Sequence, residues 1–264
     1  MRAVAAILLA ILLAVPSFGQ MVGQTRDATD IEIAAGAGVV TSVYKFGENL
    51  DVDTAADEDV WDGGGDYGGF LTAWDSLSVV SSSDVDSAGN AGALTVVVLG
   101  LDSLKAFQAD TLSMDGTNAV QSAKAWFGTY RAYVATSGDS LRNIGDLTFT
   151  ALGASAVTSK ITADRGQTRQ LTFTVPTNTT AFLTSFFGNL RKSTPSGTLV
   201  DLNIHIQDGG TGSWRQIGTY PANVYIPFEQ YIVVPAESNI KVRAGATNNN
   251  SDVSAFLSML LEAG

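Results

Sequence analysis

The chain has 264 residues, of which 15 are Lys or Arg, 26 are Asp or Glu, one is His and none is Cys, and its formal net charge is −11. The acidic balance argues against a nucleic-acid binder, because such a surface repels phosphate, and the lack of Cys excludes disulfides and thiolate metal sites. Hydrophobic residues form 45% of the chain, which is enough for a core and argues against disorder. The length allows one large β domain or two smaller ones.

Residues 1–20 form a short apolar leader. Arg2 precedes the apolar run Ala3–Val15, and small residues including Gly19 follow it, a pattern typical of a secretory signal cleaved near residue 20. The run is shorter than the roughly 20 apolar residues of a membrane-spanning helix, and no later stretch could span a bilayer. Two alternatives stay open: the leader is a helix buried in the fold, or Met21 is the true start.

After residue 20 the hydrophobic pattern has period two and predicts strands, with no convincing helix. In the first half the expected strands are Val39–Phe46, Leu77–Ser81, Ala93–Leu101, Lys105–Ser113, Ala123–Val134 and Asp146–Leu152. In the second half they are Arg169–Val175, Ala181–Leu190, Thr198–Gln207, Tyr231–Val234, Asn239–Ala246 and Val253–Leu261. The alternation is clearest in Thr198–Gln207, whereas Ala93–Leu101 is nearly all apolar and is expected at the centre of a sheet.

Many short strands separated by turn residues predict an all-β fold of antiparallel β-sandwiches of the jelly-roll type. The stretch Gly153–Gly166 is poor in long apolar side chains and follows a run of six expected strands. We therefore expect two domains after the leader, an N-terminal β-sandwich over residues 21–160 and a C-terminal jelly-roll-like β-sandwich over residues 161–264.

The segment Asp51–Gly69 is rich in carboxylates and glycines. Its members are Asp51, Asp53, Asp57, Glu58, Asp59, Asp62 and Asp66, with Gly63, Gly64, Gly65, Gly68 and Gly69. Carboxylates in a loop can bind Ca²⁺, but the EF-hand spacing fails because Ala55 and Ala56 occupy the third ligand and glycine positions. The pattern favours a solvated acidic loop that protects a sheet edge; whether Asp51–Asp66 holds Ca²⁺ in another geometry stays open.

His205 is the one imidazole available for acid–base chemistry. It shares the polar face of an expected strand with Asp201, Asn203 and Gln207, and the chain contains no G-x-S-x-G nucleophile elbow. We expect an exposed or interfacial strand histidine, and we assign no catalytic, cofactor-binding or metal-binding residue.

Tryptophans beside the acidic segment leave a sugar-binding alternative open. Trp61 and Trp74 flank the acidic loop, whereas Trp126 and Trp214 lie elsewhere in the sequence. Aromatic side chains beside carboxylates are typical of a carbohydrate-binding face or a glycosidase cleft, and equally of tryptophans at the edge of a sandwich core.

Several segments resemble a group of tailed-bacteriophage virion structural proteins. In the first half they are Val43–Asn49, Asp51–Thr54, Glu58–Gly65, Val79–Asp84 and Ala93–Asp102. In the second half they are Gly166–Thr168, Phe173–Pro176, Ala181–Leu183, Pro235–Ala244 and the closing apolar strand. The resemblance covers roughly residues 40–264. It implies a non-enzymatic subunit of the virion, as a capsid decoration, head-fibre, neck or tail protein, with other virion proteins such as the major capsid protein as partners. A secretory leader departs from this pattern, because a subunit assembled in the cytoplasm needs none.

Apolar strands late in the chain indicate self-assembly. The outward residues of Ala181–Leu190, among them Phe182, Phe186 and Phe187, and those of Val253–Leu261 exceed what one small sandwich buries. We expect some of them at a subunit interface, in a homotrimer. The alternatives are a secreted glycan- or surface-binding module and a secreted filament or surface-layer subunit, both extracellular if the leader is a true signal peptide.

Overall fold

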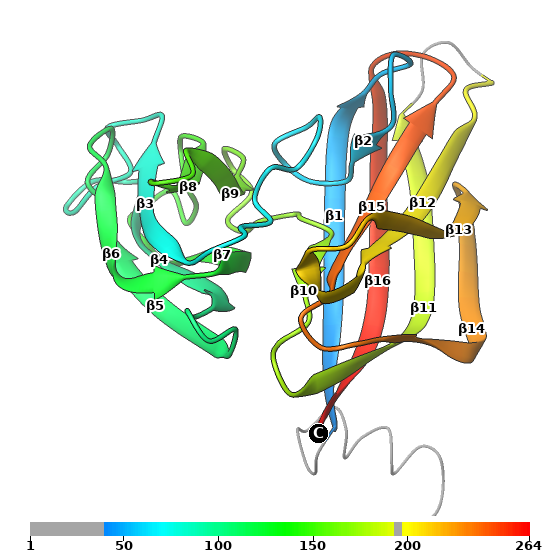
Figure 1. The fold of residues 1–264 in the computed structure, drawn as a ribbon. Helices are drawn as coiled ribbons and strands as arrows, with labels where there is room; N and C mark the ends of the chain where they lie inside the picture. The colour runs from blue at the N-terminus through cyan, green and yellow to red at the C-terminus, as the bar shows by residue number, and fades with distance from the viewer. Residues whose placement is uncertain (1–39, 193–196) are drawn as a thin grey trace, which may run out of the picture.

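The computed structural model describes residues 40–192 and 197–264 and shows two antiparallel β-sandwiches, a larger lobe and a smaller one (Figure 1). The all-β fold expected from the sequence is therefore confirmed for these residues. The leader and Met21 lie outside them. Within the described chain, no helix is long and apolar enough to cross a membrane.

The larger lobe packs two sheets against each other. Sheet A has the order β1 (Val40–Val52), β16 (Ser251–Ala263), β11 (Thr179–Lys192) and β14 (Val224–Val234). Sheet B has the order β10 (Thr172–Thr174), β15 (Asn239–Ala246), β12 (Val200–Gln207) and β13 (Trp214–Pro221), and the short β2 (Glu58–Asp59) pairs with β15. In Figure 1 sheet B lies in front of sheet A.

The strand order of the larger lobe is that of a jelly roll. If β1 and β10 to β16 are counted as strands one to eight, sheet A has the order 1-8-3-6 and sheet B the order 2-7-4-5. In this arrangement two interleaved Greek keys close the sandwich. Its core joins the inward residues of both sheets, such as Leu183, Phe186, Leu202, Ile204 and Leu257.

The smaller lobe is inserted between the first two strands of the jelly roll. One sheet has the order β6 (Val120–Trp126), β3 (Asp75–Ser81), β8 (Leu147–Ala151) and β9 (Ala156–Ile161). The other has the order β5 (Phe107–Ser113), β4 (Ala93–Leu101) and β7 (Gly128–Ser137), so the apolar strand Ala93–Leu101 is central, as predicted. This lobe has its own core around Trp126 and Phe149.

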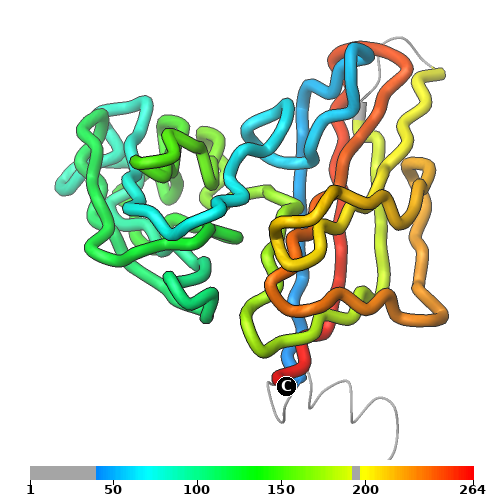
Figure 2. The backbone as a smooth tube through the Cα atoms, viewed as in Figure 1, coloured from blue at the N-terminus to red at the C-terminus, as the bar shows by residue number. Residues whose placement is uncertain are grey.

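The expected division at residue 160 differs from the observed topology. Residue 160 lies inside β9, which pairs with β8 of the smaller lobe. At the other end, β1 pairs with β16 from Val40↔Glu262 onward, so the first strand belongs to the C-terminal sandwich (Figure 2). Local alternation shows that a segment is a strand, but it does not show which distant strand completes its sheet.

Several expected strands differ from the observed ones in number or length. The range Ala123–Val134 contains the end of β6 and the beginning of β7, which are separated by Phe127. The range Arg169–Val175 contains only the short β10. The expectation missed β9, β13 and most of β14. In β13 and β14, polar residues and prolines interrupt the alternation.

Candidate functional site

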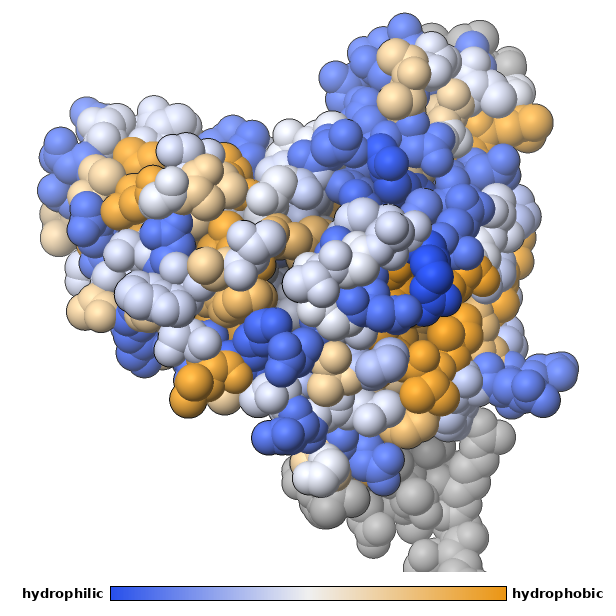
Figure 3. Space-filling view, viewed as in Figure 1, coloured by the Kyte–Doolittle hydropathy of each residue, from blue (hydrophilic) through white to orange (hydrophobic). Residues whose placement is uncertain are grey.

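The acidic segment packs against the outer face of sheet B. Asp59 is fully buried, and its Oδ2 lies 3.0 Å from Lys241 Nζ and accepts a 2.7 Å hydrogen bond from the Tyr67 amide. Arg243 lies 3.6 Å from the same carboxylate and 2.6 Å from Asp66. Hydrophilic residues gather over this upper part of the larger lobe (Figure 3). The expectation of a solvated loop is thus wrong for Asp59, because cations on β15 draw the segment onto the sheet.

Asp62 gives this segment a pH dependence. Its Oδ2 accepts a 2.8 Å hydrogen bond from the Arg169 amide, and burial raises the pKa of Asp62 to about 7. The folded state therefore binds the proton more tightly than the unfolded chain, whose carboxyl has an ordinary pKa of 3.8. The resulting stabilisation is complete below about pH 4 and is lost as the pH rises to about 7.

We predict that Asp62→Asn removes this part of the pH profile. The melting temperature of the wild type, followed by circular dichroism from pH 4 to 7, should fall relative to that of the variant, because only the wild type loses a proton there. The control is Asp139→Asn, which changes an exposed carboxyl and should leave the profile parallel to the wild type. If the pH profile of Asp62→Asn ran parallel to that of the wild type, it would contradict the raised pKa of Asp62.

His205 lies half-buried beside this cluster. It pairs across the sheet with Lys241, and its buried Nε2 has no hydrogen-bond partner among the described residues. Burial, and then the charges of Lys241 and Arg243, lower the pKa of His205. The histidine therefore borders the covered face of sheet B, and no hydroxyl nucleophile donates to it within the described chain.

A second buried charge cluster, which the sequence analysis missed, centres on Glu48. This carboxylate is 1% exposed and forms ion pairs with Arg165, Arg169 and Arg191. Arg169 also lies over the ring of Phe46, 5.9 Å from its centre. The cluster ties β1 to β11 and to the chain that returns from the smaller lobe. Glu48 stands among polar residues of β1, so no local signal in the sequence marked it as buried.

Aromatic side chains form a row across the outer face of sheet A. The strand register aligns Phe46, Phe256, Phe187 and Tyr225, one from each of the four strands. Phe46, Phe187 and Tyr225 are 42%, 38% and 62% exposed. This aromatic row gives sheet A an apolar outer face, which the smaller lobe borders at Phe46 and Phe256 through β4 and β7.

A β-bulge explains why Phe187, but not Phe186, belongs to this row. The register of β11 shifts between Leu183 and Ser185, so the alternation reverses and Phe186 turns into the core, where it is fully buried. The expectation that Phe186 faces outward is therefore wrong, whereas Phe187 is exposed and Phe182 is partly exposed.

The four tryptophans have different environments. Trp126 lies in the core of the smaller lobe, and Trp61 is buried with its Nε1 donating a 2.9 Å hydrogen bond to Gly64. Trp214 packs over Lys241, 4.8 Å from Nζ to the ring centre. Trp74 is 60% exposed and lines a groove of about 390 Å³ with Phe70 and Asp75. Of the two tryptophans beside the acidic segment, only Trp74 presents its ring to a ligand.

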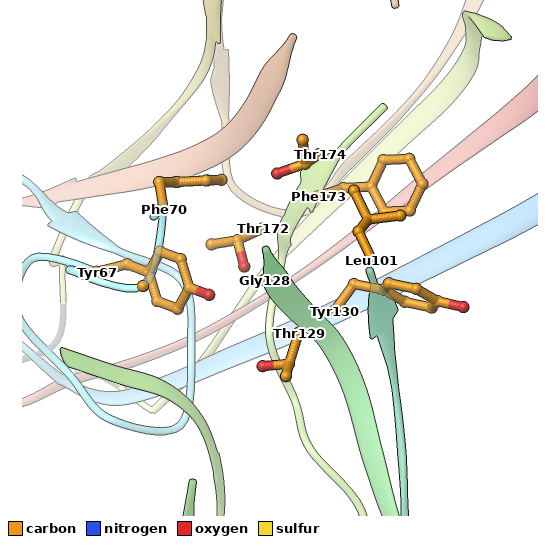
Figure 4. A pocket seen from close by; sticks show the side chains of 10 residues that line it. Tyr67, Phe70, Leu101, Gly128, Thr129, Tyr130, Thr172, Phe173 and Thr174 are labelled. Atoms are coloured by element: carbon orange, nitrogen blue, oxygen red, sulfur yellow. The ribbon is translucent and has the colours of Figure 1, made fainter. Parts of the chain in front are cut away.

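The lobes meet at a buried polar seam. Gln170 is 1% exposed; its Nε2 donates to the Thr129 carbonyl at 3.0 Å and its Oε1 accepts from Ser159 at 2.9 Å. Tyr67 donates a 2.8 Å hydrogen bond to the Thr158 carbonyl. The cavity at this seam measures about 10 Å³, with Tyr67 and Phe70 on one side and Leu101 and Phe173 on the other (Figure 4). This volume is about that of one water molecule and is too small for a ligand.

A larger groove opens beside the seam, between β1 and β7. It has a volume of about 360 Å³ and is lined by Tyr44, Phe46, Tyr130, Arg131 and Phe256, among others. Lys45 reaches it from β1 and donates a hydrogen bond to the Tyr130 carbonyl. In residues 40–192 and 197–264, no group of three or more His, Asp and Glu side chains is arranged to hold a metal ion.

Comparison with known proteins finds no matching family model and no matching curated protein. Among solved structures, the tandem CBM22 domains of Paenibacillus barcinonensis Xyn10C match 85% of this chain and 93% of their own, at 11% identity and a TM-score of 0.21. A structure of infectious bursal disease virus Gt strain matches 84% of this chain and 71% of its own, at 10% identity and a TM-score of 0.21. The VP2 subviral particle of infectious bursal disease virus matches with a TM-score of 0.18 at 11% identity. These likenesses are too distant to carry an argument about function.

Proposed function

We propose that the chain is a non-enzymatic structural subunit that self-assembles through the outer face of sheet A. The observation that carries the proposal is the aromatic row Phe46, Phe256, Phe187 and Tyr225. Large exposed apolar patches on folded proteins mark contact surfaces, and this one spans every strand of the sheet. The sequence resemblance gives the proposal its finer form: a subunit of a phage virion, in a capsid decoration, head-fibre, neck or tail position.

A second copy of the chain is the partner that this proposal names. A closed cyclic trimer joins two different patches of each subunit head to tail, and we propose a homotrimer in which the aromatic row supplies one of them, with further contacts to virion proteins such as the major capsid protein. The polar seam and the Glu48 cluster support such a role, because they link the two lobes by buried polar contacts.

We predict that Phe187→Glu weakens self-association by about 30-fold or more, the effect of losing an interface aromatic that contributes about 2 kcal/mol. Phe187 is partly exposed, so the charge is tolerated in the monomer and penalised in the interface. Sedimentation over a dilution series measures the change. Tyr225→Glu, on the same row, should act in the same way.

The matched control is Leu104→Glu, at a residue of the smaller lobe that is 75% exposed. It should assemble like the wild type. A wild type that sediments as a monomer at micromolar concentrations, or equal association of Phe187→Glu and Leu104→Glu, would contradict the proposal.

The exposed ring of Trp74 favours the alternative of a glycan-binding module. A monomeric binding module needs no assembly face and would keep the same mass at every concentration. The dilution series therefore separates the two functions. In the extracellular alternatives, the leader would direct the chain out of the cell; in the virion proposal, the chain resides in the particle.

A further inference from the structure

The groove between the lobes lies at the β1 edge of sheet A, where the smaller lobe forms its second wall. Tyr44, Phe46 and Phe256 contribute rings from the larger lobe, and Tyr130 and Arg131 project from β7. Its volume of about 360 Å³ is at the lower end of the range for small-molecule sites, roughly 300–1,000 Å³. A groove of this size admits a small molecule rather than a folded partner.

The charge of the lining is opposite to that of the chain. The lining includes Lys45 and Arg131 but no Asp or Glu, although the chain carries a net charge of −11. Lys45 is 5% exposed and donates to the Tyr130 carbonyl, and Arg131 donates a 2.9 Å hydrogen bond to Gln167 Oε1. Neither cation forms an ion pair with a carboxylate of the described chain.

Burying a cation without a counterion raises the free energy of its charged form, and this effect lowers the pKa of Lys45. Burial, and then the charge of Arg131, lower the pKa of Lys45 to about 7. From β7, Lys45 faces Arg131 and the Tyr130 ring, whose centre lies 5.7 Å from Nζ. The other residues that line the groove, from the chain after β9 and from β16, are uncharged. An anion in the groove would restore the charged form of Lys45.

The rings add a stacking surface. Tyr44 is 63% exposed and stacks on Phe256, with 5.8 Å between the ring centres, and Phe46 is 42% exposed beside them. Exposed rings of this kind bind the flat apolar face of a sugar or another ring, while Gln167 supplies a hydrogen-bonding side chain in the groove lining.

We propose that this groove binds an acidic monosaccharide or disaccharide, with the carboxylate of the ligand between Lys45 and Arg131 and the sugar ring on Tyr44 and Phe46. The proposal goes beyond self-assembly, which requires no ligand. The groove shares Phe46 and Phe256 with the aromatic row, but the assembly variants change Phe187 and Tyr225 on β11 and β14, which do not line the groove.

The test is calorimetric titration of the whole chain with D-glucuronic acid and, separately, with glucose. We expect saturable binding of glucuronic acid and binding of glucose that is weaker by about tenfold or more, since losing a charge-assisted contact costs about 1.4 kcal/mol or more. Arg131→Gln should weaken glucuronic acid binding by about tenfold, and Tyr44→Ala should weaken the binding of either sugar. Arg142→Gln, which changes an exposed arginine paired with Asp164, is the matched control and should bind like the wild type.

Changing the pH supplies an independent readout. Binding of glucuronic acid should weaken as the pH rises above about 7, because Lys45 then loses its proton while the ligand stays anionic. Equal binding of glucose and glucuronic acid, unchanged binding by Arg131→Gln, or binding of a short acidic peptide in place of the sugar would overturn the proposal. Phe187→Glu should retain glucuronic acid binding, so that a failure of assembly and a failure of the groove are distinguished.

Discussion

Replacing Glu48 by Ala is expected to lower the free energy of unfolding by about 3–5 kcal/mol, the cost of breaking a buried ion pair by removing one partner. Glu48 is 1% exposed, and its carboxylate forms ion pairs with Arg165, Arg169 and Arg191. Without it, the three guanidinium groups keep only weaker carboxylate partners: Asp252, which lies 3.8 Å from Arg191, and Asp62, whose charge acts on Arg169 and Arg165. Chemical denaturation followed by circular dichroism measures the loss.

The control for this variant is Glu229→Ala, which removes an exposed carboxylate on β14. It should change the stability by no more than about 0.5 kcal/mol. If Glu48→Ala behaves like Glu229→Ala, the buried cluster does not hold β1 to the rest of the jelly roll. The same variant should also loosen the attachment of the smaller lobe, since Arg165 and Arg169 belong to the chain that returns from it.

The second large effect is expected at Asp86, in the smaller lobe. This fully buried carboxylate accepts hydrogen bonds from Ser81 Oγ at 2.6 Å and from the amides of Ala93, Ile144 and Gly145 at 2.8, 2.8 and 2.7 Å. Asp86→Ala leaves these donors without a partner and should lower the stability of the lobe by about 3–5 kcal/mol.

Hydrogen exchange locates the effect of Asp86→Ala. Amides of β3, β4 and β8 should lose protection, while those of the jelly-roll strands β11, β12 and β16 keep theirs, because the two lobes have separate cores. Asp84→Ala, at an exposed position of the same loop, should leave both lobes protected. Equal loss of protection in both lobes would show that they unfold as one unit.

The sequence predicted those parts of the fold that depend on local pattern. Alternation identified β12 and β16, and the continuous apolar run of β4 placed it at the centre of its sheet. The sequence could not predict the sheet to which β1 belongs, because its partner strand β16 lies at the other end of the chain. Residue 160 looked like a boundary because the segment around β9 lacks long apolar side chains.

The candidate sites were harder to predict than the fold. Strict alternation placed Phe186 on the outside, and a single bulge in β11 reversed it. The carboxylates of the acidic segment looked solvated, because the cations that bind Asp59 come from β15, far along the sequence. The interlobe groove depends on β7 meeting β1, a contact between two lobes that no local pattern encodes.

Electron cryo-microscopy of the assembled material tests the central claim most directly. The account predicts ordered copies of the chain that meet through the outer face of sheet A, with Phe187 and Tyr225 buried between subunits. Dispersed single copies, or copies that meet elsewhere and leave this aromatic row in solvent, would contradict it.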